Sequence, residues 1–256
     1  MLLKLLTQKA SKKVDNFYLS IIIPAYKEQK RIHKILDAIL ELQDKVDYNI
    51  ETIVVLDGSP DKTIESAEKY HGRIRHLKII DRKKNKGKGY TVKEGILAAI
   101  GQWILFADAD NSTPIGQVKK LLERANGCQV IIGSRYTEEG KLAKPQPFYR
   151  VWGSRFLNKI IQVFAVPGIR DTQCGFKLFE NKAAKEIFSH QTFDRWSFDI
   201  EILAIARHLG YKILEVGITW YDDPHSQVNP IKDGMRMVRD AWQVRNNMRM
   251  KLYDRV

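Results

Sequence analysis

The stretch WILFADADNSTP, residues 103–114, combines an apolar run, two aspartates one residue apart and a helix-start signal. Its first five residues have the length and composition of a buried strand. Asp108 and Asp110 follow that strand, and Thr113 and Pro114 then match a helix N-cap and a first helical residue. The stretch therefore predicts a strand that ends in carboxylates and leads into a helix.

This strand-to-helix unit recurs along the chain, which is typical of strands joined by crossover helices. The other expected strands are 18–26, 51–57, 76–80, 129–134, 174–179 and 212–220. The expected helices are 28–45, 61–71, 88–100, 114–126, 151–168 and 197–210, with a final helix that opens at Asn229 and Pro230. The pattern predicts a single α/β domain after a lead-in at 1–18, with helices flanking a mainly parallel sheet.

Composition narrows the class of protein without deciding it. The 256 residues suit one domain, and the formal net charge of +13 indicates an anionic partner: nucleic acid, lipid or a phosphorylated small molecule. The two cysteines, Cys128 and Cys174, are too few for a disulfide framework and favour a reducing, cytoplasmic setting. No apolar run is long enough to span a bilayer, and the first residues lack a signal-peptide pattern.

Polar groups follow four expected strands, at the edge where open α/β sheets bind ligands. They are PAYKE (24–28), DGS (57–59), DAD (108–110) and GSR (133–135). Each alone is explained by a turn or a cap, whereas all four in this order favour a binding site. Asp108 and Asp110 can face one site because residues two apart in a strand point the same way. A divalent metal that carries a nucleotide diphosphate accounts for this pair in a basic chain.

Seven stretches together resemble the GT-A glycosyltransferases of family two. They are IIIPAYKE (21–28), VVLDGSPDKT (54–63), NKGKGYTVKEGI (85–96), FADADNSTP (106–114), GSR (133–135), DTQCGFKLF (171–179) and RWSFDIE (195–201). Within that family they look most like the dolichyl-phosphate glucose and mannose synthases and their bacterial polyprenyl-phosphate relatives. The resemblance covers nearly the whole chain from Leu19 onward. It implies a GT-A domain over 19–256, with a nucleotide-sugar half (19–135) and an acceptor half (136–256).

The resemblance also implies an activity. The expected enzyme is an inverting glycosyltransferase that moves a sugar, in the first instance glucose from UDP-glucose, onto dolichyl or polyprenyl phosphate. Its product is a β-linked lipid-phosphate sugar, and its cofactor is Mg²⁺ or Mn²⁺. A mannose synthase that uses GDP-mannose and a transferase that acts on a soluble glycan are the alternatives within the family. A basic nucleic-acid-binding module is the non-enzyme alternative, although the sequence shows no nucleic-acid motif.

Residue roles follow from the resemblance position by position. The expected donor-nucleotide residues are Pro24, Tyr26, Glu28, Asp57, Lys88, Asp108 and Asp110. Asp110 is expected to hold the metal, with Asp108 as the second candidate ligand. Arg135, Arg150 and Ser154 are expected at the acceptor phosphate. The candidate catalytic residues are Asp110, Arg135 and Asp199, although the helix dipole alone also explains an acid at position 199.

The chain departs from the pattern of its relatives at two positions. Leu56 stands where many relatives have a first acid before Asp57, so base recognition is expected to differ. Gln227 follows Ser226 where relatives often have a lysine, which removes a cation from the donor diphosphate.

Residues 148–168 combine apolar, aromatic and basic side chains, as interfacial helices do, although core packing is the alternative. The net positive charge favours an anionic leaflet. We therefore expect a peripheral protein on the cytoplasmic face of a membrane, with room for a separate membrane-protein partner.

Overall fold

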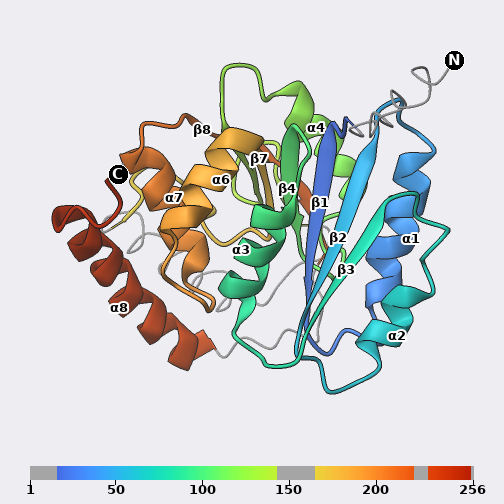
Figure 1. Ribbon diagram of the computed structural model, residues 1–256. Helices are drawn as coiled ribbons and strands as arrows, with labels where there is room; N and C mark the ends of the chain where they lie inside the picture. The colour runs from blue at the N-terminus through green and yellow to red at the C-terminus, as the bar shows by residue number, and fades with distance from the viewer. Residues whose placement is uncertain (1–15, 143–164, 222–229, 255–256) are drawn as a thin grey trace, which may run out of the picture.

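A mixed seven-stranded sheet forms the centre of the computed structural model, which describes residues 16–142, 165–221 and 230–254 (Figure 1). Its strands are β1 (Leu19–Ala25), β2 (Ile50–Asp57), β3 (Leu77–Arg82), β4 (Trp103–Ala107), β5 (Val130–Ser134), β7 (Phe176–Glu180) and β8 (Ile213–Gly217). They are ordered β3-β2-β1-β4-β7-β5-β8, and β7 runs antiparallel to its neighbours β4 and β5. The other pairs are parallel, as expected. A short parallel pair joins β6 (Lys141–Leu142) to β9 (Thr219–Trp220).

Helices cover both faces of this sheet (Figure 1). One face is covered by α1 (Ile32–Gln43), α2 (Thr63–Glu68), η1 (Ile115–Gln117) and α4 (Val118–Glu123). The other is covered by α3 (Lys88–Ala98), α6 (Asn181–His190), α7 (Phe198–His208) and α8 (Pro230–Arg249). Alternate residues of a strand enter opposite clusters, so Ile21 and Ile23 pack toward α1 and Ile22 packs toward α3. Burial on both faces explains the nearly continuous apolar runs of the strands.

Several elements differ from the sequence-based expectation, and the short strand β6 is one of them. α6 has no counterpart among the expected helices, because it follows β7 without an intervening loop. The strand expected at 212–220 is divided at Ile218 into β8 and β9. Residues 151–164 of the expected apolar helix lie outside the described residues. In the part of the chain that is described, each helix is too short or too polar to cross a bilayer.

The helix after β4 also begins differently from the prediction. A 3₁₀ turn, η1, starts at Ile115 and continues into the short α4, so Thr113 is not the N-cap and Pro114 is not the first helical residue. The Asn111 side-chain oxygen instead accepts the N–H of Ile115 at 3.1 Å. Asn111 is in the left-handed region, at φ 56°, which asparagine tolerates better than most residues. This conformation, which sequence patterns do not reveal, brings its amide to the start of the turn.

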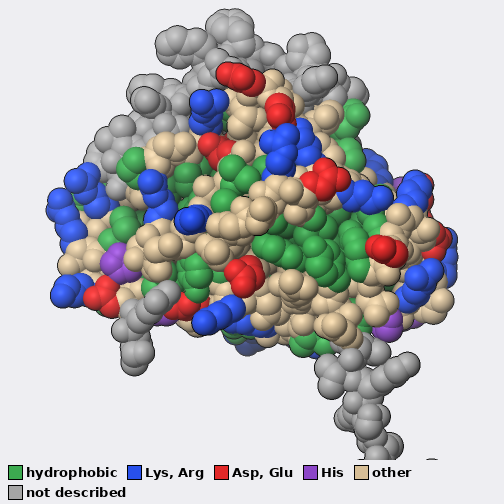
Figure 2. Space-filling view, turned by 90° about the horizontal axis from the view of Figure 1, so that it is seen from above, with side chains coloured by type: hydrophobic (Ala, Val, Ile, Leu, Met, Phe, Trp, Pro, Cys, Tyr) green, Lys and Arg blue, Asp and Glu red, His purple; other side chains and the backbone are tan. Residues whose placement is uncertain are grey.

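The chain leaves β1, β2 and β4 at a common edge because these strands are parallel. Figure 2 views the opposite edge, where apolar side chains gather near the middle and charged ones lie around them. At that opposite edge, the buried Glu51 carboxylate accepts the Ser20 hydroxyl at 2.5 Å and the N–H of Ile100 at 3.0 Å. Ser20 in turn accepts the N–H of Gly101 at 2.8 Å. These bonds tie the α3–β4 connection to the first two strands.

Removing this acceptor is expected to destabilise the fold without touching the other edge. In Glu51→Ala, the Ser20 hydroxyl and the Ile100 N–H lose their partner, which should lower the free energy of unfolding by about 1–3 kcal/mol. Urea denaturation followed by circular dichroism measures the change. Glu41→Ala is the control, because its pair with Lys45 is exposed and is expected to contribute less than about 0.5 kcal/mol. Equal losses in the two variants would contradict the assignment.

Candidate active site

The acid pair lies directly after β4. The N–H of Asp108 donates to the carbonyl of Gly175 at 3.1 Å, and Asp110 Oδ1 accepts the N–H of Ser112 at 2.8 Å. The backbone is therefore held on both sides of the pair. Burial and the neighbouring charge of Asp108 raise the pKa of the Asp110 carboxyl. The carboxylates of Asp108 and Asp110 therefore interact electrostatically, as expected if both face one site.

Lys88 approaches this pair from the start of α3. Its ammonium lies 2.7 Å from Asp108 Oδ1 and 5.1 Å from the centre of the exposed Trp196 ring. Burial acts to lower the pKa of Lys88, but Asp108, Asp199 and Asp110 outweigh it and hold the pKa above its usual value. The lysine therefore stays charged, and it lies beside the acids as expected.

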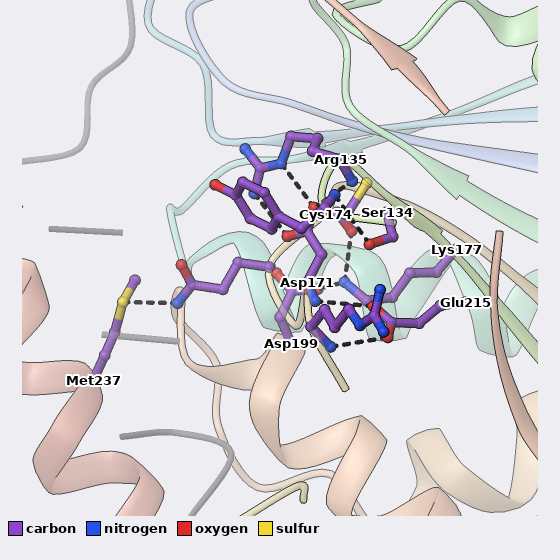
Figure 3. Close-up of polar contacts among 11 residues, drawn as sticks. Ser134, Arg135, Asp171, Cys174, Lys177, Asp199, Glu215 and Met237 are labelled. Atoms are coloured by element: carbon purple, nitrogen blue, oxygen red, sulfur yellow. Dashed lines mark hydrogen bonds and ion pairs between the residues drawn. The ribbon is translucent and has the colours of Figure 1, made fainter. Parts of the chain in front are cut away.

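A second lysine, Lys177, is buried in β7 and was missed by the sequence analysis. Its ammonium donates to the Asp199 carboxylate and, at 2.6 Å, to the carbonyl of Cys174 (Figure 3). Burial raises the pKa of the Asp199 carboxyl, and the charges of Lys177 and Lys88 oppose that shift. The helix dipole therefore does not fully explain why an acid stands at position 199, because Asp199 also pairs with Lys177. The signal that could have revealed Lys177 is a lone cation inside the apolar run FKLF, because buried lysines are rarely unpaired.

Asp57 shapes the loop that delivers Lys88. It is buried at the end of β2, and its carboxylate accepts the N–H groups of Lys86 at 2.8 Å and Gly87 at 2.9 Å. The guanidinium of Arg82 lies 3.1 Å from the same carboxylate. Both Asp57 oxygens thus already accept hydrogen bonds within the chain. Its contact with a nucleotide base stays a prediction.

The loop after β1 completes this edge of the sheet. Tyr26 is exposed, and Glu28 receives two hydrogen bonds from Arg31, at 2.8 and 2.7 Å. Burial raises the pKa of the Glu28 carboxyl despite Arg31, and the charges of Asp110 and Asp108 add to the shift. Pro24 lies next to the end of β1. The structure therefore places Glu28 within electrostatic reach of the acid pair, with Pro24 and Tyr26 at the same edge of the sheet.

Leu56, at the position where the family resemblance implies an acid, is fully buried in the cluster beneath α1. It belongs to the opposite face of the sheet from α3, because neighbouring strand residues alternate. An acid at position 56 would have to be accommodated in that core.

Arg135 follows β5 and is fixed by an acid. Its Nε and Nη2 each lie 2.8 Å from the Asp171 carboxylate, and its N–H donates to Asp171 at 2.9 Å. Asp171 is itself held, because its N–H donates to Glu215 at 2.9 Å (Figure 3). One edge of the guanidinium is therefore occupied, and a phosphate contact of Arg135 stays a prediction. Arg150, Ser154, Ser226 and Gln227 lie outside the described residues.

Cys174 is a buried thiol rather than a nucleophile. Burial raises its pKa to about 12, so the reactive thiolate is scarce at neutral pH. Both cysteines are free within the described residues.

The acid pair suits a metal that arrives with a nucleotide. Within the described ranges, no group of three or more His, Cys, Asp or Glu is arranged to hold a metal ion alone. Mg²⁺ typically takes only one or two carboxylates when phosphate oxygens and water complete its shell. The raised pKa of Asp110 reflects burial and repulsion from Asp108 that a cation relieves. The donor set therefore fits a divalent cation shared with a diphosphate.

Comparison with known proteins places the chain in a family. The family described as "Glycosyl transferase family 2" matches residues 20–188, so the chain belongs to that family and is a glycosyltransferase. It is 36% identical over 248 residues to the dolichyl-phosphate beta-glucosyltransferase of Dictyostelium discoideum, covering 91% of this chain and 75% of that protein. The Homo sapiens protein of the same name is 36% identical over 245 residues, covering 89% of this chain and 74% of that protein.

A solved structure supports the fold independently. Glucosyl-3-phosphoglycerate synthase from Mycobacterium tuberculosis, in complex with Mn²⁺, UDP-glucose and phosphoglyceric acid, matches with a TM-score of 0.62 at 18% identity. The match covers 90% of this chain and 78% of that one. The GT-A fold expected from the sequence is confirmed.

Breaking the Asp57 anchor is expected to loosen the loop before Lys88. Asp57→Asn removes the charge opposite Arg82 and turns one acceptor into a donor, which should lower the free energy of unfolding by about 3 kcal/mol. Tryptic cleavage after Lys84 and Lys86 should also become faster.

Limited proteolysis with mass spectrometry detects the loosened loop. The control is Asp44→Asn, which alters an exposed ion pair with Arg75. An unchanged cleavage rate in Asp57→Asn would contradict the anchoring role.

Proposed function

We propose that this enzyme transfers glucose from UDP-glucose to dolichyl or polyprenyl phosphate, with inversion at the anomeric carbon. The observation that carries the proposal is the acid pair with Lys88 at the end of β4. It lies in a chain about one-third identical to dolichyl-phosphate beta-glucosyltransferases over most of its length. Family membership supplies the reaction type, and these relatives supply the sugar and the acceptor class.

Each group at the sheet edge has a role toward the donor. Tyr26, Glu28 and Asp57 line the base and ribose side of the site. Asp110 would hold Mg²⁺ or Mn²⁺ with the help of Asp108, and the cation would supply stabilisation of the charge on the diphosphate leaving group. Lys88 supplies a second positive charge close to the same place. These groups act by alignment and by electrostatic stabilisation.

The acceptor phosphate is already an anion and needs no strong base. Its oxygen forms a bond to the anomeric carbon, while the bond from that carbon to the diphosphate oxygen breaks and its electron pair leaves with UDP. Asp199 is buried and paired with Lys177, which suits a site without a general base. Arg135, Arg150 and Ser154 are proposed to hold the acceptor phosphate.

A lipid acceptor requires contact with a membrane surface. Trp242 on α8 and Met250 just beyond it are 57% and 63% exposed, and Arg249 and Lys251 flank Met250. Exposed aromatic and apolar residues beside cations are typical of interfacial segments. Each basic residue near an anionic leaflet contributes about 1 kcal/mol of attraction. A peripheral location on the cytoplasmic face, with or without a membrane-protein partner, is part of the proposal.

Transfer to lipid is the direct test of this function. Protein with Mn²⁺ and labelled UDP-glucose should convert dolichyl phosphate into organic-extractable glycolipid, and chelation should stop the reaction. Asp110→Asn should reduce the rate about 100-fold or more, because metal-assisted stabilisation of the leaving group is worth several kcal/mol. The exposed Asp81→Asn is the matched control.

Three other outcomes would redirect or overturn the proposal. Transfer only from GDP-mannose would favour a mannose synthase. Label that stays in aqueous polymer would remove the lipid acceptor. Full activity in Asp110→Asn would overturn the metal assignment.

The lack of space around Gly175 allows a second test of the donor site, by a purely steric substitution. A Cβ at this position would lie 1.9 Å from Oδ2 and 2.4 Å from Cγ of Asp108, so an alanine would displace the carboxylate. Gly175→Ala should therefore weaken the binding of UDP with Mn²⁺ about tenfold while the protein stays folded. Calorimetric titration measures the affinity. Gly116→Ala is the control, because its Cβ would meet nothing within 4 Å, and equal affinities in both variants would contradict this prediction.

A further inference from the structure

Among the residues that the structure describes, Lys177 is the most deeply buried cation near the acid pair. Its side chain is 0% exposed, and that of Asp199 is 5% exposed. Charges buried this completely are tolerated only when they are paired and hydrogen-bonded. Lys177 meets both conditions, because its ammonium contacts the Asp199 carboxylate and the Cys174 carbonyl at 2.6 Å. The question is whether the pair only completes the core or also serves the site.

Through its contact with Cys174, Lys177 is linked to Asp108 by the backbone of one turn. Cys174 precedes Gly175, whose carbonyl accepts the N–H of Asp108 at 3.1 Å. Gly175 also lies directly against the Asp108 carboxylate, with no room for a side chain of its own. Lys177 thus holds the turn on which Asp108 rests.

Through its contact with Asp199, Lys177 is also linked to Lys88. The charge of Asp199 acts on the Lys88 ammonium, which in turn lies 2.7 Å from Asp108. The Lys88 and Lys177 ammonium groups lie 5.3 and 5.9 Å from the centre of the same Phe106 ring. Positive and negative side chains therefore alternate from Lys177 through Asp199 and Lys88 to Asp108 (Figure 3 shows the Lys177 end).

We propose that Lys177 is a positioning residue for the donor site: it holds the turn beneath Asp108 and the carboxylate beside Lys88. The proposal rests on the proposed function only in that the donor is a nucleotide diphosphate bound with a divalent cation. Lys177 itself touches neither. Groups that orient the partners of a metal-binding residue typically affect affinity by about 10–100-fold.

The test separates positioning from simple charge compensation. Lys177→Met leaves Asp199 buried without its partner and is expected to fold poorly. The double variant Lys177→Met/Asp199→Leu removes both charges and carries the test. Asp199→Asn, which keeps the side-chain volume and an acceptor for Lys177, is the second variant. Each is compared with Glu51→Ala, which alters a buried carboxylate at the opposite edge of the sheet.

The readouts are the Kd for UDP with Mn²⁺ and the thermal unfolding temperature. We expect the double variant to remain folded and its Kd to rise at least about tenfold, and Asp199→Asn to raise the Kd in the same direction. Glu51→Ala should lose thermal stability and keep the wild-type Kd. Wild-type Kd values in both the double variant and Asp199→Asn would overturn the proposal and leave Lys177 with a purely structural role.

These readouts need no acceptor, so they are independent of the lipid assay. The wild-type protein could bind UDP with Mn²⁺ and yet transfer nothing to dolichyl phosphate. That result would contradict the proposed acceptor and would leave the proposed role of Lys177 unaffected. If wild-type protein binds GDP with Mn²⁺ instead, the proposed donor fails and the same variants are compared with GDP.

Discussion

The alternation of buried charges behind β4 is the constraint on which the proposed donor site depends. Lys177 and Asp199 are almost inaccessible to water, and Lys88 and Asp108 continue the alternation toward the open edge. Each charge is stable there because an opposite charge lies beside it. Together with the backbone hydrogen bond from Asp108 to Gly175, these pairs hold the Asp108 carboxylate in place without any ligand, which would suit the proposed nucleotide site.

This arrangement reconciles acids at the centre of the site with a net charge of +13. In the proposed reaction a diphosphate, which carries more negative charge than either aspartate, would enter together with a divalent cation. Lys88 stands beside that position, and Asp57 sets the loop from which it extends. Under the proposed function, the site would balance charge as the nucleoside diphosphate leaving group departs, and it would need no strong general base. A phosphate acceptor, which already carries negative charge, is consistent with a site that needs no strong general base.

The sequence predicts the sheet and the acid pair because both depend on local patterns. Apolar runs fix the strands, and a period of two brings Asp108 and Asp110 to one side. Lys177 escaped prediction because its partner Asp199 is 22 residues away, and the letters FKLF do not distinguish a buried lysine from an exposed one. The capping role of Asn111 depends on a left-handed backbone angle. The anchoring of the loop by Asp57 depends on a β2–β3 neighbourhood that exists only once the sheet forms.

The central claim is that the acid pair receives a cation together with a nucleotide diphosphate. Crystals grown with UDP and Mn²⁺, with data collected at the manganese absorption edge, test it most directly. The account predicts an anomalous peak bound by the Asp110 carboxylate and by diphosphate oxygens. Bound UDP with no peak at that carboxylate, or a peak at a different set of side chains, would contradict it.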